Sequence, residues 1–307
     1  MWDGTINEGH LYASFRLTVH MYESDGSDSK TVGSGTGFVI RSRLPTGGRK
    51  GYLVTNRHVL DPSFAKPTGR GIDKVEVIGF AQVGDARPIR FTIQSPQPEF
   101  ADGGADVAVI DLERATIPGG CPELTEMSNL RLANASDFQE RLHVGAQVLM
   151  PGYPSIDGVA AERPILVSGT VASDPREMAE IGRERFPNCV LCHSFSWGGM
   201  SGSPVFALLP KESLTWGDLE HGVSRELYLV GINRGHLRIG GMAEGALTYF
   251  VKTPLLAALL RRIGAKGLLR NQHDDDPADD GRPELIHQEV ELDPEDPDAP
   301  ASHGFVG

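Results

Sequence analysis

The chain has 307 residues, of which 39% are hydrophobic and 23% charged, and it carries a formal net charge of -12 at pH 7. Such a composition is typical of a soluble globular protein that is long enough to bury a sizeable core. Its 37 glycines and 21 prolines favour short strands joined by turns over long helices. Three cysteines are too few for a disulfide framework in a chain of this length.

The negative charge is concentrated at the C-terminal end. From Asn271 onward there are twelve acidic residues and one base, Arg282, which leaves 29 acidic and 28 basic residues in 1–270. Neither part has the clustered Lys and Arg that bind phosphate backbones, so we expect no nucleic-acid partner. The acidic, proline-rich end has few large apolar residues, and we predict an acidic disordered tail over residues 269–307.

Two features of the sequence bear on its location. Residues 1–5 lack a basic segment followed by an apolar run, so we expect no signal peptide. No stretch of about 18 apolar residues occurs, so we expect no membrane span and no membrane partner. These features predict a cytoplasmic protein.

Apolar segments alternate with turn-rich ones along most of the chain. They cover residues 11–22, 36–40, 52–55, 75–80, 89–93 and 107–112 in the first half, and 147–150, 165–171, 189–193, 204–208 and 227–233 in the second. This spacing predicts an all-β barrel or sandwich. The segment 117–122, which is rich in Pro and Gly, is the predicted linker between the two sets.

One helix is predicted after these strands. Thr253 is the expected N-cap, Pro254 suits the first turn, and Gly264 is the expected stop. Large apolar residues share one face of this helix, namely Leu255, Leu256, Leu259, Leu260 and Ile263.

One glycine-rich segment suits peptide-bond hydrolysis by a serine. That reaction needs a hydroxyl in a tight turn, an imidazole base, a carboxylate that orients the base, and backbone N–H groups that face the developing oxyanion. Segment 198–206, with the sequence GGMSGSPVF, places Ser201 between glycines that permit a sharp turn. We expect the amides of Gly199 and Ser201 to face one oxyanion site.

Two further segments supply a base and an acid. His58 follows the apolar strand 52–55 at the point where a loop begins, and Asp106 opens the apolar run 107–112. Taken singly, a histidine after a strand is more often structural, and such an aspartate is more often a turn cap. Taken with Ser201, they supply a general base and the carboxylate that orients it.

The segments GSGTGFVI (33–40), LVTNRHV (53–59), DVAV (106–109) and GMSGSPV (199–205) together resemble the trypsin-like, chymotrypsin-fold serine peptidases. The likeness is strongest to their intracellular and HtrA-like bacterial members. The order of His58, Asp106 and Ser201 and the gaps between them match that family. The resemblance extends over roughly residues 10–262. Because only 44 residues follow Ile263 and they are rich in acidic residues, we expect no PDZ domain there.

The resemblance implies both a fold and an activity. The fold is all-β, with two antiparallel β-barrels over 1–120 and 121–268, a C-terminal helix, and a site between the barrels. The activity is that of a serine endopeptidase with protein or peptide substrates and with no cofactor and no metal. Ser201 is then the nucleophile, His58 the general base and Asp106 the orienting acid, and the amides of Gly199 and Ser201 form the oxyanion hole.

The resemblance also implies a substrate pocket. Its expected residues are Phe195, Ser196, Asn233, Arg234, Gly235 and His236. With Phe195 as its floor, the pocket has no counter-charge for Lys or Arg and favours a small or medium apolar residue such as Ala, Val or Leu. A second interpretation has Arg234 or His236 pointing inward to select Asp or Glu. A third has Arg234 pointing to solvent or meeting an acid of the tail.

Two positions depart from the family pattern. Met200 stands where secreted digestive relatives have an acid that pairs with a new N-terminus, so we expect activity without N-terminal maturation, and control by a partner protein, the substrate or loop ordering. Arg234 stands where relatives often have a hydroxyl residue near the catalytic acid, which leaves open how Asp106 is held.

Other motifs suggest different chemistry. CVLCH (189–193) matches the haem attachment pattern and half of a zinc site, but it lies in a predicted strand with no second ligand pair nearby, so we interpret it as two packed thiols. No lysine follows the glycines of 33–37 as in a phosphate loop. Ser203 stands where the G-x-S-x-G motif of α/β-hydrolases needs glycine, and in those enzymes the acid and the histidine follow the serine.

Two other functions remain open. The first is a peptidase fold that binds extended peptides without cutting them, because Arg234 or a closed loop spoils the site. The second is a scaffold whose acidic tail recruits a partner.

Overall fold

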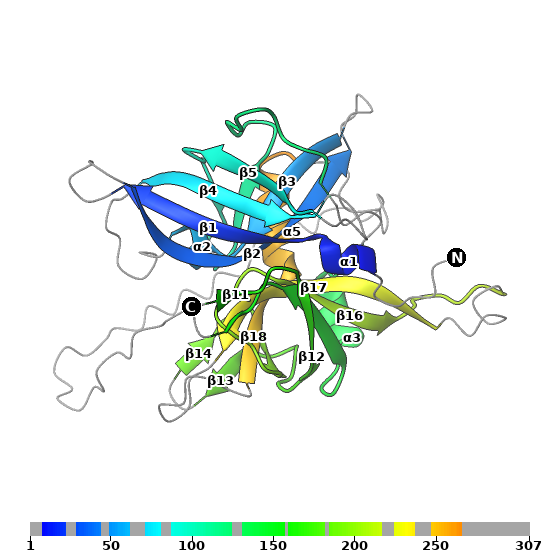
Figure 1. Cartoon of the computed structure of the whole chain (residues 1–307). Helices are drawn as coiled ribbons and strands as arrows, with labels where there is room; N and C mark the ends of the chain where they lie inside the picture. Colours follow the sequence, from blue (N-terminus) through cyan, green and yellow to red (C-terminus); the bar gives the residue numbers. More distant parts are fainter. Residues whose placement is uncertain are drawn as a thin grey trace, which may run out of the picture.

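The computed structural model describes residues 8–22, 29–43, 49–61, 71–80, 87–124, 131–156, 159–181, 184–216, 224–236 and 247–265. Two large β-sheets of seven strands each form the upper and lower halves of the molecule (Figure 1). The predicted tail over 269–307 lies outside the described residues.

The first sheet has the strand order β5-β4-β1-β2-β3-β7-β6 and is antiparallel throughout. Its strands are β1 (Ser14–Tyr22), β2 (Ser29–Arg43), β3 (Arg49–Thr55), β4 (Ile72–Gly79), β5 (Ile89–Gln94), β6 (Glu99–Phe100) and β7 (Ala108–Asp111). Alternate residues of β1 are buried, as expected for a strand with one face toward a core. Phe15, Leu53, Val77, Ile93 and Ile110 of five different strands meet in that core.

The second sheet closes on itself. Its strands are β8 (Arg131–Leu132), β9 (Gln147–Gly152), β12 (Ile165–Val171), β15 (Cys189–His193), β16 (Pro204–Pro210), β17 (Arg225–His236) and β18 (Leu247–Lys252). The order is β16-β9-β12-β15-β18-β17-β8, and β16 also pairs with β17, which makes a closed barrel of six strands with β8 added in parallel to β17. A closed barrel leaves no free edge among these six strands.

The remaining elements are short. They are the helices α1 (Glu8–Tyr12), α2 (Arg57–Leu60), α3 (Ala135–Glu140) and α5 (Thr253–Arg262), and the hairpins of β10 (Ser155–Ile156) with β11 (Val159–Ala160) and β13 (Ala179–Ile181) with β14 (Glu184–Phe186). The predicted all-β, chymotrypsin-like fold with a C-terminal helix is confirmed. The chain passes from one sheet to the other between Asp111 and Arg131, and the exact division at residue 120 stays a prediction.

The predicted start of the C-terminal helix was wrong by one residue. Lys252 is the N-cap of α5, and Thr253 is already helical. The Thr253 hydroxyl does not cap the helix. It donates a hydrogen bond to the Ala133 carbonyl, which is distant in the sequence, at 2.7 Å. Gly264 follows the helix with a φ of 76°, as expected for a residue that ends a helix.

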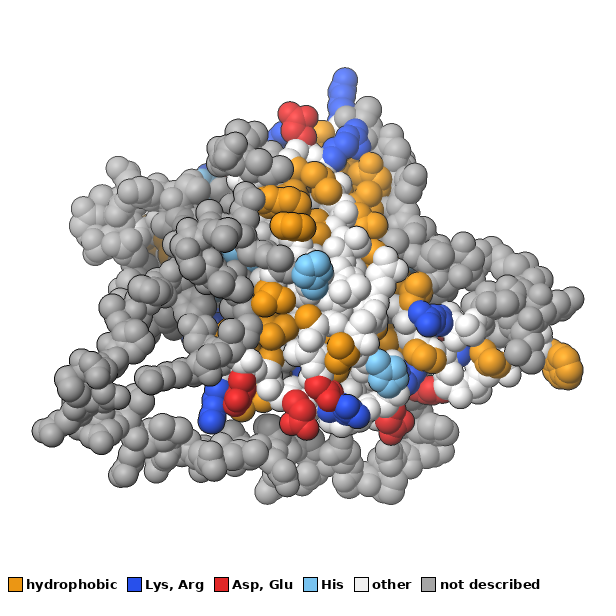
Figure 2. All heavy atoms as spheres, turned by 90° about the horizontal axis from the view of Figure 1, so that it is seen from below, with side chains coloured by type: hydrophobic (Ala, Val, Ile, Leu, Met, Phe, Trp, Pro, Cys, Tyr) orange, Lys and Arg blue, Asp and Glu red, His pale blue; other side chains and the backbone are white. Residues whose placement is uncertain are grey.

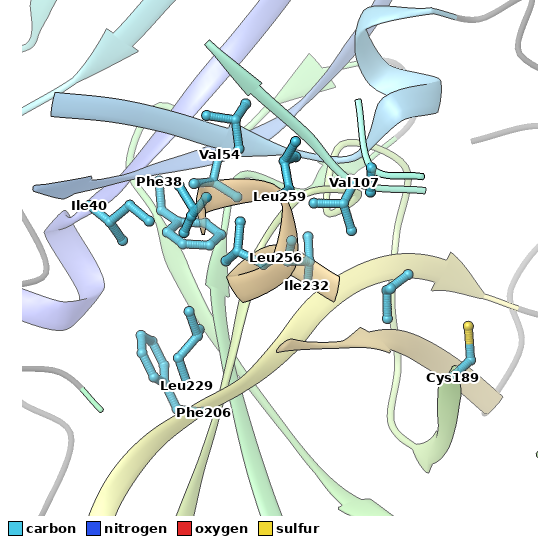
Figure 3. Close-up of a cluster of buried hydrophobic side chains, with 14 of the residues drawn as sticks. Phe38, Ile40, Val54, Val107, Cys189, Phe206, Leu229, Ile232, Leu256 and Leu259 are labelled. Atoms are coloured by element: carbon cyan, nitrogen blue, oxygen red, sulfur yellow. The ribbon is translucent and has the colours of Figure 1, made fainter. Parts of the chain in front are cut away.

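The two halves share a hydrophobic core (Figure 3). Phe38 and Val54 reach it from the first sheet, Ile232 from the second, and Leu256 and Leu259 from α5. All five side chains are almost completely buried. Helix α5 therefore connects the two halves, because its apolar face packs against both.

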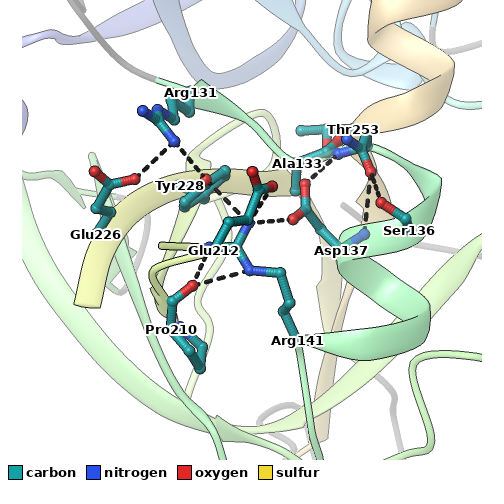
Figure 4. A network of polar contacts seen from close by, with 11 residues as sticks. Arg131, Ala133, Ser136, Asp137, Arg141, Pro210, Glu212, Glu226, Tyr228 and Thr253 are labelled. Carbon is teal, nitrogen blue, oxygen red and sulfur yellow. Dashed lines mark hydrogen bonds and ion pairs between the residues drawn. The ribbon is translucent and has the colours of Figure 1, made fainter. Parts of the chain in front are cut away.

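A polar network holds α3 to the second barrel (Figure 4). Arg141 forms an ion pair with Asp137 at 2.6 Å and donates to the Tyr228 hydroxyl at 3.0 Å. Arg131 donates to the same hydroxyl at 3.1 Å and pairs with Glu226 at 2.8 Å. These contacts attach α3 to β17, the strand that carries Tyr228.

The underside of the molecule carries no concentrated patch of basic residues among those described. Figure 2 shows Lys and Arg side chains that are scattered over this face, and several of them lie beside acidic side chains. A surface that binds a phosphate backbone needs such residues gathered together.

The shared core predicts the effect of a cavity at α5. Leu256→Ala should lower the free energy of unfolding by about 2–5 kcal/mol, because it removes a fully buried side chain from the core that the two halves share. Urea denaturation followed by fluorescence measures the change. Leu255→Ala, the same change at a partly buried position of the same helix, should cost less. Equal costs would contradict the placement of α5 between the halves.

Candidate active site

The predicted acid and base lie in contact. The Asp106 carboxylate is 3% exposed and accepts two hydrogen bonds from His58, one from ring Nδ1 to Oδ2 at 2.7 Å and one from the backbone N–H to Oδ1 at 2.9 Å. Asn56 donates its amide to the Asp106 backbone carbonyl at 2.8 Å. β3 delivers His58 to the first turn of α2, and Asp106 precedes β7, the strand paired with β3. His58 is therefore held in place by hydrogen bonds from both its ring and its backbone.

Arg234 of β17 also binds the acid. Its Nε donates to Asp106 Oδ2 at 2.9 Å, and its guanidinium lies 5.4 Å from the centre of the Tyr249 ring. The side chain of Arg234 therefore meets an acid of the first half and does not point to solvent, as one interpretation of the sequence had it. Selection of acidic substrate residues stays a prediction, and the tail lies outside the described residues. The long side chain reaches across to the first half of the molecule, because a buried carboxylate offers it a fully paired position.

The charge of Arg234 affects the acid directly. Burial raises the pKa of the Asp106 carboxyl, but the hydrogen bonds from His58 and the charge of Arg234 outweigh burial, and the pKa lies below its ordinary value of 3.8. The carboxylate is therefore ionised at neutral pH, the form that accepts a hydrogen bond from an imidazole N–H.

The turn that carries Ser201 is held by its carbonyl groups. Within the second half, the Gly198 carbonyl accepts from the Ser155 N–H at 2.7 Å. The Met200 carbonyl accepts from the Ser203 N–H at 3.1 Å and from the side-chain amide of Asn233 at 2.9 Å. The peptide bonds of the described residues are all trans, so the N–H of each peptide unit points away from its carbonyl.

The other two carbonyls of the turn are held from the first half. The Thr36 hydroxyl of β2 donates to the Gly199 carbonyl at 2.7 Å, and the Thr36 N–H donates to the Ser201 carbonyl at 2.7 Å. The sequence analysis assigned no role to Thr36. The one signal that could have identified it is a hydroxyl residue placed between two glycines, Gly35 and Gly37.

The two N–H groups that the sequence suggested for an oxyanion stay available. The N–H groups of Met200 and Gly202 donate to the carbonyls of Trp197 and Asn233. Among the described residues, the N–H groups of Gly199 and Ser201 donate to no protein group. Gly199 has a φ of 85°, which favours glycine at this position of the turn.

The Ser201 hydroxyl lies 3.2 Å from the backbone carbonyl of Arg234, to which it donates a hydrogen bond. In the described part of the chain no hydrogen bond joins this hydroxyl to His58. The structure therefore brings the predicted acid and base together and places the predicted nucleophile against β17.

The expected pocket residues differ in what they offer. Phe195 is 56% exposed and stacks on Trp197 with ring centres 6.5 Å apart, so it does not form a buried floor. Asn233 is fully buried, and its amide donates to Met200 and to Ser196. It supports the nucleophile turn from behind and keeps no free amide for a substrate.

Two further pocket residues end β17. A Cβ at Gly235 would lie 3.9 Å from the Ser201 hydroxyl oxygen, so this glycine borders the nucleophile. His236 is partly exposed beside it.

Met200, which stands where secreted digestive relatives have an acid, is fully buried in the apolar core of the second barrel.

The two thiols of CVLCH cannot share a ligand, because Cys189 packs in the core between the halves and Cys192 in the core of the second barrel. Burial raises the pKa of Cys189 to about 11 and that of Cys192 to about 12. Both thiols are therefore protonated at neutral pH, whereas metal sites use the thiolate.

Comparison with known proteins decides the family. A trypsin-like peptidase domain matches residues 35–209, which is more than half of the chain. The chain belongs to the trypsin-like peptidase family. A similar solved structure is that of the Rv3671c protease from M. tuberculosis in its active form, with 18% sequence identity, a TM-score of 0.45 and 84% coverage of each chain. No curated protein matches the sequence. An HtrA-like origin for this peptidase domain stays a prediction.

The pairing of Arg234 with Asp106 predicts a loss of stability in Arg234→Leu. Removing one partner of a buried ion pair should lower the free energy of unfolding by about 3 kcal/mol at pH 7. Because the pKa of Asp106 lies below 3.8, its ionised form stabilises the fold at neutral pH, and this contribution is lost as the pH falls through the lowered pKa. The deficit should therefore shrink in acid.

Urea titrations at several pH values measure this deficit. Arg176→Leu is the matched control, because it breaks an exposed pair with Asp174 and should change stability little. A deficit in Arg234→Leu that is independent of pH would show that lost packing, and not the charge, explains it.

Proposed function

We propose that the protein is a serine endopeptidase in which Ser201 is the nucleophile, His58 the general base and Asp106 the orienting acid. The observation that supports this most directly is the hydrogen bonding of the nucleophile turn. Every carbonyl from Gly198 to Ser201 has a donor, and among the described residues the N–H groups of Gly199 and Ser201, on each side of Met200, donate to no protein group. Two unpaired amides beside a serine are suited to an oxyanion.

The reaction uses both halves of the molecule. The Ser201 hydroxyl attacks the substrate carbonyl as its proton passes to Nε2 of His58, and the new oxyanion accepts hydrogen bonds from the amides of Gly199 and Ser201. The protonated imidazole then donates to the leaving amine, and an ester remains on Ser201. A water molecule, deprotonated by His58, hydrolyses this ester and regenerates the enzyme.

The proposed reaction requires the Ser201 hydroxyl to leave the Arg234 carbonyl. An extended peptide that lies along β17 presents a backbone N–H to that carbonyl, and this N–H replaces the serine as donor. The freed hydroxyl then turns to His58. Substrate binding and activation of the nucleophile are coupled in this way.

Arg234 has a supporting role in this proposal. Its side chain holds Asp106 in place of the hydroxyl residue common in the family, and so maintains the position of His58. The alternative function, peptide binding without cleavage, is favoured by one observation, the absence of a hydrogen bond between Ser201 and His58 in the described part of the chain. Chemical labelling of Ser201 separates the two.

We propose a small or medium apolar residue before the scissile bond. Apart from Arg234 and His236, the residues that the family resemblance assigns to the pocket are uncharged, namely Phe195, Ser196, Asn233 and Gly235. The charge of Arg234 is taken by Asp106. A charged substrate side chain would therefore lack a partner here, and burying it would cost several kcal/mol.

Location and partners remain proposals of the same kind. None of the helices in the described part of the chain combines the length and the apolar character needed to cross a bilayer. We propose a cytoplasmic peptidase that acts on proteins or peptides, with activity controlled by a partner or by substrate and not by N-terminal cleavage.

The proposed chemistry predicts the effect of single substitutions. Ser201→Ala and His58→Ala should each lower kcat by about 10⁴-fold or more with little loss of folding. Asp106→Asn should be similarly damaging, because an amide favours the wrong imidazole tautomer. A fluorophosphonate probe with mass spectrometry should label Ser201 in the wild type and in Ser136→Ala, a change at an exposed helix position. A wild type that is folded but unlabelled would favour the binding function.

The proposed pocket predicts the residue preference. A positional-scanning peptide library should show Ala, Val or Leu preferred before the scissile bond, since Arg234, the charged residue among those expected in the pocket, is paired with Asp106. Preference for Lys or Arg would contradict this assignment. Preference for Glu or Asp that disappears in His236→Ala would assign selection to His236 instead.

A further inference from the structure

We propose that Thr36 is a positioning residue that aims the oxyanion amides from the opposite half of the molecule. The inference rests on the proposed function, because it concerns the same oxyanion site. Thr36 lies on β2 of the first sheet, whereas Gly199 and Ser201 lie on the turn before β16 of the second. No motif or comparison assigns it a role.

The contacts of the turn alternate between the two halves. The carbonyls of Gly198 and Met200 are held by groups of the second half, and those of Gly199 and Ser201 by the hydroxyl and the N–H of Thr36. The first pair fixes the peptide units that carry the two free N–H groups. Thr36 fixes the peptide units that follow them, so that neither free N–H can rotate about the adjoining backbone bonds.

The Thr36 hydroxyl has one possible orientation. It donates to the Gly199 carbonyl at 2.7 Å and accepts from the Tyr153 N–H at 3.0 Å. The Thr36 carbonyl in turn accepts from the Thr55 hydroxyl at 2.7 Å. Thr36 is fully buried, so water does not replace a lost bond and the Gly199 carbonyl would be left without its donor.

The backbones approach so closely here that side chains are excluded. A Cβ on Gly202, whose φ is 89°, would overlap the Thr36 carbonyl. A Cβ on Gly35 would lie 3.0 Å from the Ser201 carbonyl oxygen. Because the two backbones are held this closely, the Thr36 hydroxyl has a fixed position against the Gly199 carbonyl, and its hydrogen bond sets the tilt of the Gly199 peptide.

This role predicts a specific kinetic effect. Donors that face the oxyanion act in the transition state and contribute little to ground-state binding. Loss of the hydroxyl in the isosteric change Thr36→Val should therefore lower kcat by about 10–100-fold, less than the loss of a whole oxyanion donor, and leave KM nearly unchanged. Thr36→Ser keeps the hydroxyl and should retain most of kcat.

The experiment compares four proteins with a fluorogenic peptide chosen from the library. The matched control is Thr253→Val, which removes an equally buried hydroxyl that donates to a carbonyl at 2.7 Å away from the site. It should lose similar stability in urea and keep kcat. A fall in kcat that Thr253→Val shares, or that Thr36→Ser fails to restore, would overturn the positioning role.

A second measurement does not depend on turnover. The amide resonances of Gly199 and Ser201 in ¹⁵N-labelled protein should shift in Thr36→Val and return in Thr36→Ser. Unshifted resonances would overturn the inference even if Ser201 is labelled by the fluorophosphonate. Shifted resonances in a protein that is never labelled would support the positioning by Thr36 and reject the proposed peptidase activity.

Discussion

The close approach of β2 to the nucleophile turn is the constraint on which the rest of the site depends. Gly35 and Gly202 allow two backbones to meet where no side chain fits, and Thr36 makes the hydrogen bonds between them. β2 pairs in register with β3, whose end leads to His58. The contact that orients the turn of Ser201 therefore also sets how far the base lies from it.

A second link between the halves is electrostatic. Asp106 belongs to the first half and Arg234 to the second, and their ion pair is almost completely buried on the side of the acid. Burying a carboxylate is costly, and the guanidinium of Arg234 offsets part of that cost. The orientation of His58 consequently depends on the docking of the two halves, as the geometry of the nucleophile turn does.

Sequence reasoning reached the elements whose signals are local. The strands at 165–171 and 189–193 were predicted to the residue, because their apolar runs end at turns. The acid–base contact of His58 and Asp106 was inferred from the family pattern. Thr36 was missed because its bond to Gly199 joins residues 163 positions apart and leaves no periodic trace. The pairing of Arg234 with Asp106 was not predicted, because the partner of a long side chain depends on residues that are neighbours only in the folded structure.

Arg234 joins the two ends of the proposed proton path. Its side chain donates to Asp106, and its backbone carbonyl accepts from the Ser201 hydroxyl. The side chain keeps its bond throughout the reaction, since the carboxylate stays ionised, whereas the carbonyl can exchange the serine for the N–H of a bound peptide. Because the side chain of Arg234 is held by Asp106, its backbone carbonyl keeps a fixed position. In the proposed mechanism, the exchange at the carbonyl therefore moves the hydroxyl of Ser201 and not the strand, so a substrate would activate the nucleophile without rearranging the site.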